Sequence, residues 1–230
     1  MPIPGVFAPH AYVNTFGPRT LSFVTTDYID GEEDSSCSFT GVSLSTAASN
    51  RWIIVGILGL MTNEYTASTI TSCTVNGYPA SIVVQDVHGG DKAIAGIAVA
   101  YCPTGTTGTI VVNFNSAIDS CHIAVWKATG LVRYAPYDSN TDTSGTMTFS
   151  LNTLSDGFII GIGTSDDTFI GSSTWTNLTE RYDTTKAVVT GVRSSSHTVT
   201  GADTTTSGSP VTITLSIGNQ DDRVLVAASF

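Results

Sequence analysis

Two hydrophobic patterns recur along the chain, and both are typical of β-strands. In "TIVVNFN" (109–115) and "VTITLSI" (211–217), branched apolar residues alternate with polar ones, which predicts strands with one buried face. In "WIIVGILGL" (52–60) and "FIIGIGT" (158–164) the apolar run is continuous, which predicts strands covered on both faces. Hardly any stretch shows a 3.6-residue period, so we expect an all-β fold.

Turn signals separate these runs. They are "NGYP" (76–79), "HGGD" (88–91), "PTGTTG" (103–108) and "SDGF" (155–158), all rich in the Gly, Pro, Asn and Asp residues that favour tight turns. Short strands joined by such turns are typical of β-sandwiches and barrels.

The chain contains an internal repeat. The corresponding segments, in order, are "CSFTGVSLST" (37–46) with "GTMTFSLNTL" (145–154), "RWIIVGILGL" (51–60) with "DGFIIGIGTS" (156–165), "KAIAGIAVAY" (92–101) with "KAVVTGVRSS" (186–195), and "GTIVVNFNSAIDSCHIAVWKAT" (108–129) with "SPVTITLSIGNQDDRVLVAASF" (209–230). This repeat predicts a jelly-roll-like β-sandwich over residues 21–230, with two sheets built by internal duplication of about five strands, 37–129 and 145–230. Two small sandwiches joined by residues 132–144 are the alternative.

Residues 1–20 differ from the repeats and predict an extended N-terminal arm. Prolines at 2, 4, 9 and 18 oppose helix formation and weaken strand pairing. The apolar content is nevertheless too high for a solvated tail. We therefore expect the arm to bind a partner subunit through Ile3, Val6, Phe7, Tyr12 and Phe16.

Charge and cysteine content narrow the function classes. The formal net charge is −10 and only 12% of the 230 residues are charged, which argues against nucleic acid or an anionic membrane as partner. The sequence has no apolar run long enough for a membrane span, and its N-terminus lacks the features of a signal peptide. Cys37, Cys73, Cys102 and Cys121 form no metal-binding pattern, and we expect free core thiols, with one or two disulfides as the alternative.

The search for catalytic motifs favours a protein that is not an enzyme. No G-x-S-x-G occurs, and Cys121 and His122 would point to opposite faces of one strand. The remaining candidate acids and bases are scattered along the sequence: His10, His88, His197, Glu32, Glu33, Glu64 and Glu180. We expect Trp52 and Trp126 to pack in the core, because both lie inside apolar strands.

One stretch approaches a metal-binding pattern. Asp138, Asn140 and Asp142 stand at positions 1, 3 and 5 of a calcium loop, but Thr143 and Phe149 replace the required Gly and Glu. An Asx-rich turn is the simpler interpretation. The sequence therefore predicts no metal and no cofactor.

The run "AGIAVAYCPTGTTGTIVVNFNSAIDSCHIAVWKATGL" (95–131), together with "LTERYDTT" and the terminal "LVAASF", resembles a sequence type found in structural proteins of tailed bacteriophages. The resemblance covers about residues 50–230 and leaves out the arm. It implies a β-sandwich component of the virion and no catalytic residue.

We therefore expect a virion protein, assembled in the host cytoplasm, that decorates the capsid as a cement protein and docks on the head lattice through its arm. The expected partners are the major capsid protein or tail proteins, and further copies of the chain, for example in a trimer. A tail or fibre module and a carbohydrate-binding adhesin are the alternatives. Exposed aromatic side chains on one face would favour the adhesin.

Overall fold

The computed structural model describes residues 17–61, 68–88, 93–167, 172–190, 193–217 and 222–230, apart from the side chains of 31–33, 166–167, 186–190 and 193–198. Every regular element in these residues is a strand, so the all-β prediction is confirmed. The strands are β1 (Thr20–Ser43), β2 (Arg51–Leu60), β3 (Ile70–Val75), β4 (Tyr78–Val87), β5 (Ala93–Tyr101), β6 (Thr107–Thr129), β7 (Asp138–Asp142), β8 (Met147–Leu151), β9 (Ser155–Asp167), β10 (Ser173–Thr176), β11 (Thr179–Thr190), β12 (Arg193–Ser207), β13 (Val211–Ile217) and β14 (Asp222–Ser229).

The first half of the chain forms a barrel. Its six-stranded sheet has the order β1-β6-β2-β5-β4-β3, and β3 also pairs with β6. The long strand β6 pairs with β3 through residues 110–114 and with β2 through residues 120–129. These two pairings close β2, β3, β4, β5 and β6 into a ring, while β1 covers the outer edge of β6 along most of its length.

The second half forms two further sheets. One has the order β11-β12-β9-β14-β7 and the other β10-β13-β8. Side chains from β8, β10 and β13 pack against one face of β9, β12 and β14, and form a buried cluster that includes Met147, Trp175 and Leu215. The second half is therefore a small sandwich.

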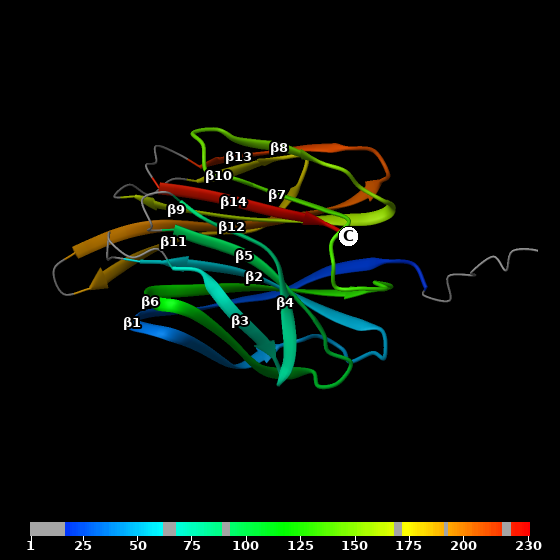
Figure 1. Ribbon diagram of the computed structural model, residues 1–230, viewed down its shortest axis with the longest axis horizontal. Helices are drawn as coiled ribbons and strands as arrows, with labels where there is room; N and C mark the ends of the chain where they lie inside the picture. Colours follow the sequence, from blue (N-terminus) through cyan, green and yellow to red (C-terminus); the bar gives the residue numbers. More distant parts are fainter. Residues whose placement is uncertain (1–16, 62–67, 89–92, 168–171, 191–192, 218–221) are drawn as a thin grey trace, which may run out of the picture.

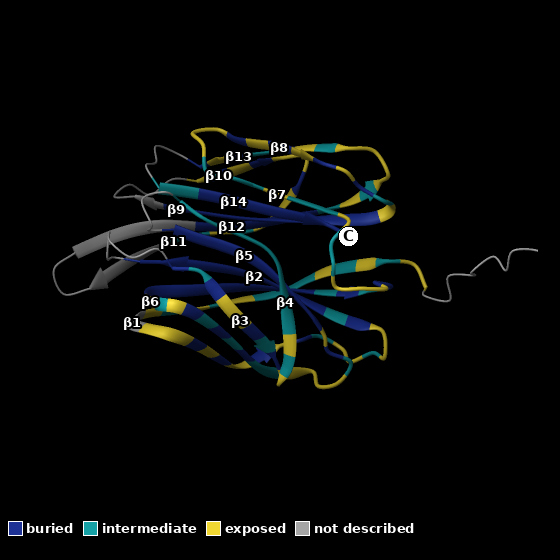
Figure 2. Cartoon of the chain, viewed as in Figure 1, coloured by how far each residue is buried: buried dark blue, intermediate teal, exposed yellow. Residues whose placement is uncertain are grey.

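A third core joins the two halves. The outer face of β2, β5 and β6 packs on the remaining face of β9, β12 and β14, in a cluster that includes Ile54, Trp126, Ile162 and Val226. Figure 1 shows these strands stacked in the middle of the molecule, and Figure 2 colours most of their described length as buried. The two continuous apolar runs lie in β2 and β9, so the prediction that these strands are covered on both faces is confirmed.

The predicted pair of sheets is only partly right. The described strands form three sheets instead of two, and the first closes on itself. The strand expected at 109–115 is longer than predicted, because it is part of β6, which runs from Thr107 to Thr129. Among the described residues there is no helix with the length and apolar character needed to cross a membrane.

Candidate functional site

The five arm residues predicted to bind a partner, Ile3, Val6, Phe7, Tyr12 and Phe16, lie outside the described residues. Residues 17–19 are the first that the structure describes, and we call them the arm root. There the backbone of Gly17, Pro18 and Arg19 lies against Gly130, where an added Cβ atom would come within 2.7 Å of the Gly17 carbonyl oxygen. The Thr20 and Thr129 hydroxyls are 2.7 Å apart, so the arm root is fixed beside the segment that links the two halves.

That linking segment carries an exposed surface, which we call the linker patch: Val132, Arg133, Tyr134 and Tyr137. The exposed fractions of the side chains are 51% for Val132, 54% for Tyr134 and 49% for Tyr137. Together with Arg19, three of these residues border a shallow groove of about 30 Å³. The arm root and the linker patch therefore lie at the same end of the molecule (Figure 1).

A second candidate lies where the two halves meet, and we call it the seam pocket. It is a hollow of about 210 Å³ lined by Thr26, Asp27, Tyr28, His122, Ile123, Tyr182, Thr184 and Val199. These residues come from β1 and β6 of the first half and from β11 and β12 of the second. The pocket therefore forms only when the two halves of the chain pack together.

Aromatic side chains shape the seam pocket. The ring of Tyr28, which is 48% exposed, stacks on the imidazole of His122 with centroids 5.5 Å apart and planes 15° apart. The His122 Nε2 atom lies 3.8 Å from an Asp30 carboxylate oxygen. On the inner side, Phe23 stacks on Tyr182 at 6.0 Å and closes the seam. Burial raises the pKa of the Tyr182 phenol.

A hydrogen-bonded group fastens the two halves beside the pocket. The indole Nε1 of Trp126, on β6, donates to Asp203 Oδ2 at 2.7 Å. Arg181, on β11, donates to both oxygens of the same carboxylate at 2.9 and 2.7 Å. This hydrogen bonding raises the pKa of Arg181. Asp203 is almost fully buried, and a buried carboxylate is costly unless it is hydrogen-bonded. The indole of Trp126 on one side and the guanidinium of Arg181 on the other provide these hydrogen bonds.

The candidate acids and bases whose side chains are described have separate neighbours. His88 Nδ1 lies 2.8 Å from Asp222, His122 faces the seam, and Glu180 accepts a hydrogen bond from Ser173 at 3.2 Å. The remaining candidates, His10, His197, Glu32, Glu33 and Glu64, lie outside the described residues or side chains. Within the described part, the structure does not bring the predicted acids and bases into one site.

The calcium-loop residues lie on a strand, β7, and only the last of them, Asp142, forms the expected Asx turn, with Ser144. The Asp138 carboxylate accepts hydrogen bonds from the backbone and side-chain N–H groups of Asn152. Asp142 accepts from the backbone N–H groups of Ser144 and Thr148 at 2.8 Å. Both carboxylates thus fasten neighbouring backbone. No metal-binding group of three or more ligands occurs among the described residues.

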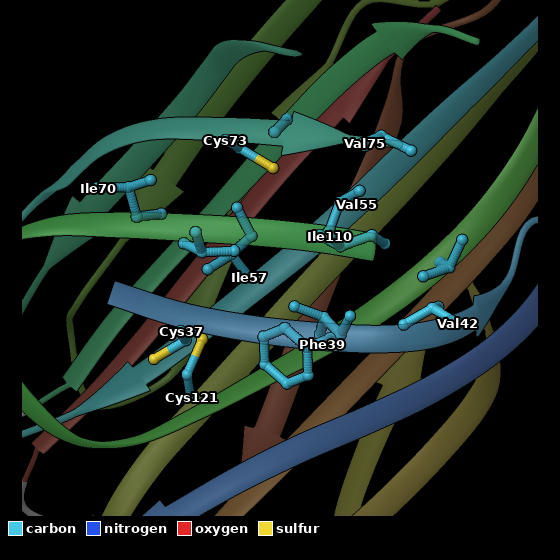
Figure 3. Close-up of a cluster of buried hydrophobic side chains, with 14 of the residues drawn as sticks. Cys37, Phe39, Val42, Val55, Ile57, Ile70, Cys73, Val75, Ile110 and Cys121 are labelled. Atoms are coloured by element: carbon cyan, nitrogen blue, oxygen red, sulfur yellow. The ribbon is translucent and has the colours of Figure 1, made fainter. Parts of the chain in front are cut away.

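All four cysteines are free and buried, as expected. The sulfur atoms of Cys37, Cys73 and Cys121 lie in the barrel core (Figure 3). Burial raises the pKa of Cys73 to about 12 and that of Cys121 well above its usual value. Cys121 faces the barrel while His122 lines the seam, which confirms that the two side chains point to opposite faces.

Sequence reasoning missed the seam pocket, because its residues come from four strands spread between positions 26 and 199 and look like ordinary strand residues. It also missed the linker patch, although "LVRYAPY" (131–137) combines aromatic and basic residues and could have signalled an exposed contact surface. The chain matches no protein-family model, no curated protein and no solved structure.

Proposed function

We propose that this protein is a non-enzymatic structural component of a bacteriophage virion that decorates the capsid. Its arm and the linker patch together would bind the head lattice. The observation that carries this proposal is the position of the patch: three exposed apolar or aromatic side chains within six residues, at the root of an apolar arm.

The composition of the linker patch suits a protein interface. Tyrosine and arginine are enriched in interface cores, where they combine a large contact area with hydrogen bonding. Arg19 and Arg133 border the groove beside Tyr137, although the chain as a whole carries a net charge of −10. A partner with an acidic and apolar surface would complement this end of the molecule.

If the molecule docks on the capsid by the end that carries the linker patch, the rest of the molecule faces outward. The strands that cross the middle of the stack are buried on both faces, which makes the body a rigid unit. The sheet β8-β13-β10 presents hydroxyl side chains, such as Thr148, Ser150 and Thr212, on its outer face. A rigid body with a polar outer face and one apolar end is the arrangement that a subunit docked on a lattice requires.

We also propose that the two halves are copies of one duplicated unit. The supporting observation is the pairing order: β6-β2-β5-β4 in the first half corresponds to β14-β9-β12-β11 in the second. This order matches β5 with β12, and so moves the counterpart of 92–101 from the predicted 186–195 into 193–207. In the same way, β3 and β1 flank the first part of β6 as β10 and β8 flank β13. Asn76 and Asn177, both with positive φ, occupy corresponding turns.

Deletion of residues 1–18 tests the docking proposal, because it ends before β1 and leaves every described strand whole. Particles of the encoding phage, prepared without this protein, are incubated with the full chain or the truncated chain, and occupancy is measured by electron microscopy. We expect the full chain to cover the head and the truncated chain to bind at less than a tenth of that occupancy. Binding of the truncated chain at full occupancy would contradict the arm's role.

A double variant, Tyr134→Ala with Tyr137→Ala, tests the linker patch in the full chain. We expect at least tenfold weaker binding to the same particles. Tyr28→Ala is the matched control, since Tyr28 is equally exposed but lies at the seam pocket. Attachment of the full chain to the tail, or to no part of the particle, would overturn the capsid assignment.

A further inference from the structure

We propose that the seam pocket binds one uncharged sugar ring of a glycan. This binding function is independent of docking on a capsid, because the pocket and the linker patch share no residue. The lining groups, the size and the charge of the pocket support this class of ligand.

The pocket offers polar groups and an aromatic face side by side. Thr26, Tyr28 and His122 lie on one face of the β1–β6 pair, since directly paired residues point the same way and Tyr28 pairs with His122. Tyr182 and Thr184, on β11, stand opposite. Hydroxyl and imidazole groups can each donate or accept a hydrogen bond. A sugar ring requires this combination, because its hydroxyls are both donors and acceptors and its C–H face stacks on aromatic rings.

Tyr28 is positioned as a platform. One face of its ring is covered by His122, yet the residue remains 48% exposed. The stacked imidazole holds the phenol ring in one orientation, so little conformational entropy would be lost when a ligand packs on its open side. An exposed tyrosine held in this way is a preformed contact surface.

Buried hydroxyl groups next to the pocket lack partners. Ser120 Oγ and Thr164 Oγ1 are buried and form no hydrogen bond. Ser120 lies two residues from His122 on the same face of β6, and Thr164 pairs directly with Val199, a pocket residue. Buried polar groups are nearly always hydrogen-bonded, and an exception calls for a water molecule or a ligand group. Both hydroxyls are buried and neither lines the pocket, so the partner expected for each is a buried water molecule beside the pocket and not the ligand itself.

Size and charge limit the ligand. A hollow of about 210 Å³ is smaller than the roughly 300 Å³ at which pockets for drug-sized molecules begin. It holds the equivalent of roughly seven water molecules at about 30 Å³ each, which is the scale of one sugar ring. No lysine or arginine lines it among the described residues, and Asp27 and Asp30 lie at or beside it. An anionic ligand would be repelled, so an uncharged sugar fits best.

The experiment is an NMR titration of the full chain with the methyl glycosides of glucose, galactose, mannose, N-acetylglucosamine and rhamnose. We expect at least one to bind with a dissociation constant on the order of 1 mM, a value corresponding to about −4 kcal/mol. Two variants, Tyr28→Ala and Thr184→Val, should each weaken that binding at least tenfold. Both positions are partly exposed, and Thr184→Val preserves the shape of the side chain, so the fold should be retained.

Tyr134→Ala is the matched control, because this tyrosine is exposed to a similar degree but belongs to the linker patch. It should leave glycoside binding unchanged, and Tyr28→Phe should also bind within a few fold of the unaltered chain. The proposal fails if none of the five glycosides binds. It also fails if the pocket variants bind as well as the unaltered chain, or if Tyr134→Ala abolishes binding, which would place the sugar at the linker patch.

Discussion

At the scale of single residues, Arg51 shows how a buried charge can serve the fold without a carboxylate partner. Its side chain is fully buried. Its guanidinium donates to the carbonyl oxygens of Leu44, Ser45, Cys102 and Thr104 at distances between 2.6 and 3.0 Å. Arg51 therefore ties the loop between β1 and β2 to the loop between β5 and β6. Five N–H donors in a rigid plane make arginine suited to this task.

Replacement of Arg51 by methionine should lower the free energy of unfolding by about 3 kcal/mol, because several buried carbonyl groups lose their donors at once. Urea denaturation followed by tryptophan fluorescence measures the change. Arg133→Met, at an exposed position, is the control and should change stability by less than about 0.5 kcal/mol. A loss below about 1 kcal/mol for Arg51→Met would show that water replaces the guanidinium.

At the scale of elements, the close approach of neighbouring sheets explains why β2 and β9 contain glycine within apolar runs: Gly56 of β2 faces β9, and Gly163 of β9 faces β13. A Cβ atom at Gly56 would lie 2.3 Å from the Ile162 side chain, and one at Gly163 would lie 2.1 Å from Leu215. Each glycine lets a neighbouring sheet approach closely, and larger side chains there would force the layers apart. The apolar runs with their glycines are thus adapted to burial between layers.

The hydrogen bonds to Asp203 predict an order of mutational effects. Asp203→Ala should destabilise the protein by about 2 kcal/mol or more, because it leaves the fully buried Trp126 N–H group without an acceptor. Arg181→Ala should cost less, since Arg181 is 40% exposed and water can replace part of its interaction. Thermal unfolding of both variants and the unaltered chain checks this order. Equal losses, or a larger loss for Arg181→Ala, would contradict it.

At the scale of the whole molecule, the core between the halves makes their folding interdependent. Each half contributes one apolar sheet face to it, including Trp126 from the first and Ile162 from the second. A half released from its partner would expose that face to water, at a cost that scales with the apolar area. We therefore expect the two halves to behave as one cooperative unit.

Expression of residues 17–131 alone tests this interdependence. We expect the fragment to aggregate or to lack a cooperative thermal transition, whereas the full chain should unfold in a single calorimetric transition. Light scattering and differential scanning calorimetry provide the measurements. A soluble, monomeric fragment with its own sharp transition would show that the barrel is an independent domain.

The sequence by itself determined the local features of this protein. The continuous run at 52–60 became β2, the turn at "NGYP" joins β3 to β4, and Cys121 and His122 point to opposite faces. These features follow from periodicity and turn chemistry, which depend on neighbouring residues alone. Buried thiols also follow from the position of each cysteine in or at the end of a predicted strand, where a free thiol behaves as a small apolar group.

Only the tertiary structure decided how the strands close and what their assembly creates. Alternating side chains show that a strand has a buried face, but they do not specify which distant strand it pairs with, so the closure of the barrel through β6 was not predicted. The seam pocket depends on the same long-range packing: Tyr28 and Thr184 are separated by more than 150 positions and become neighbours only when the two halves stack. Local patterns define the strands, whereas contacts between distant strands define the sites.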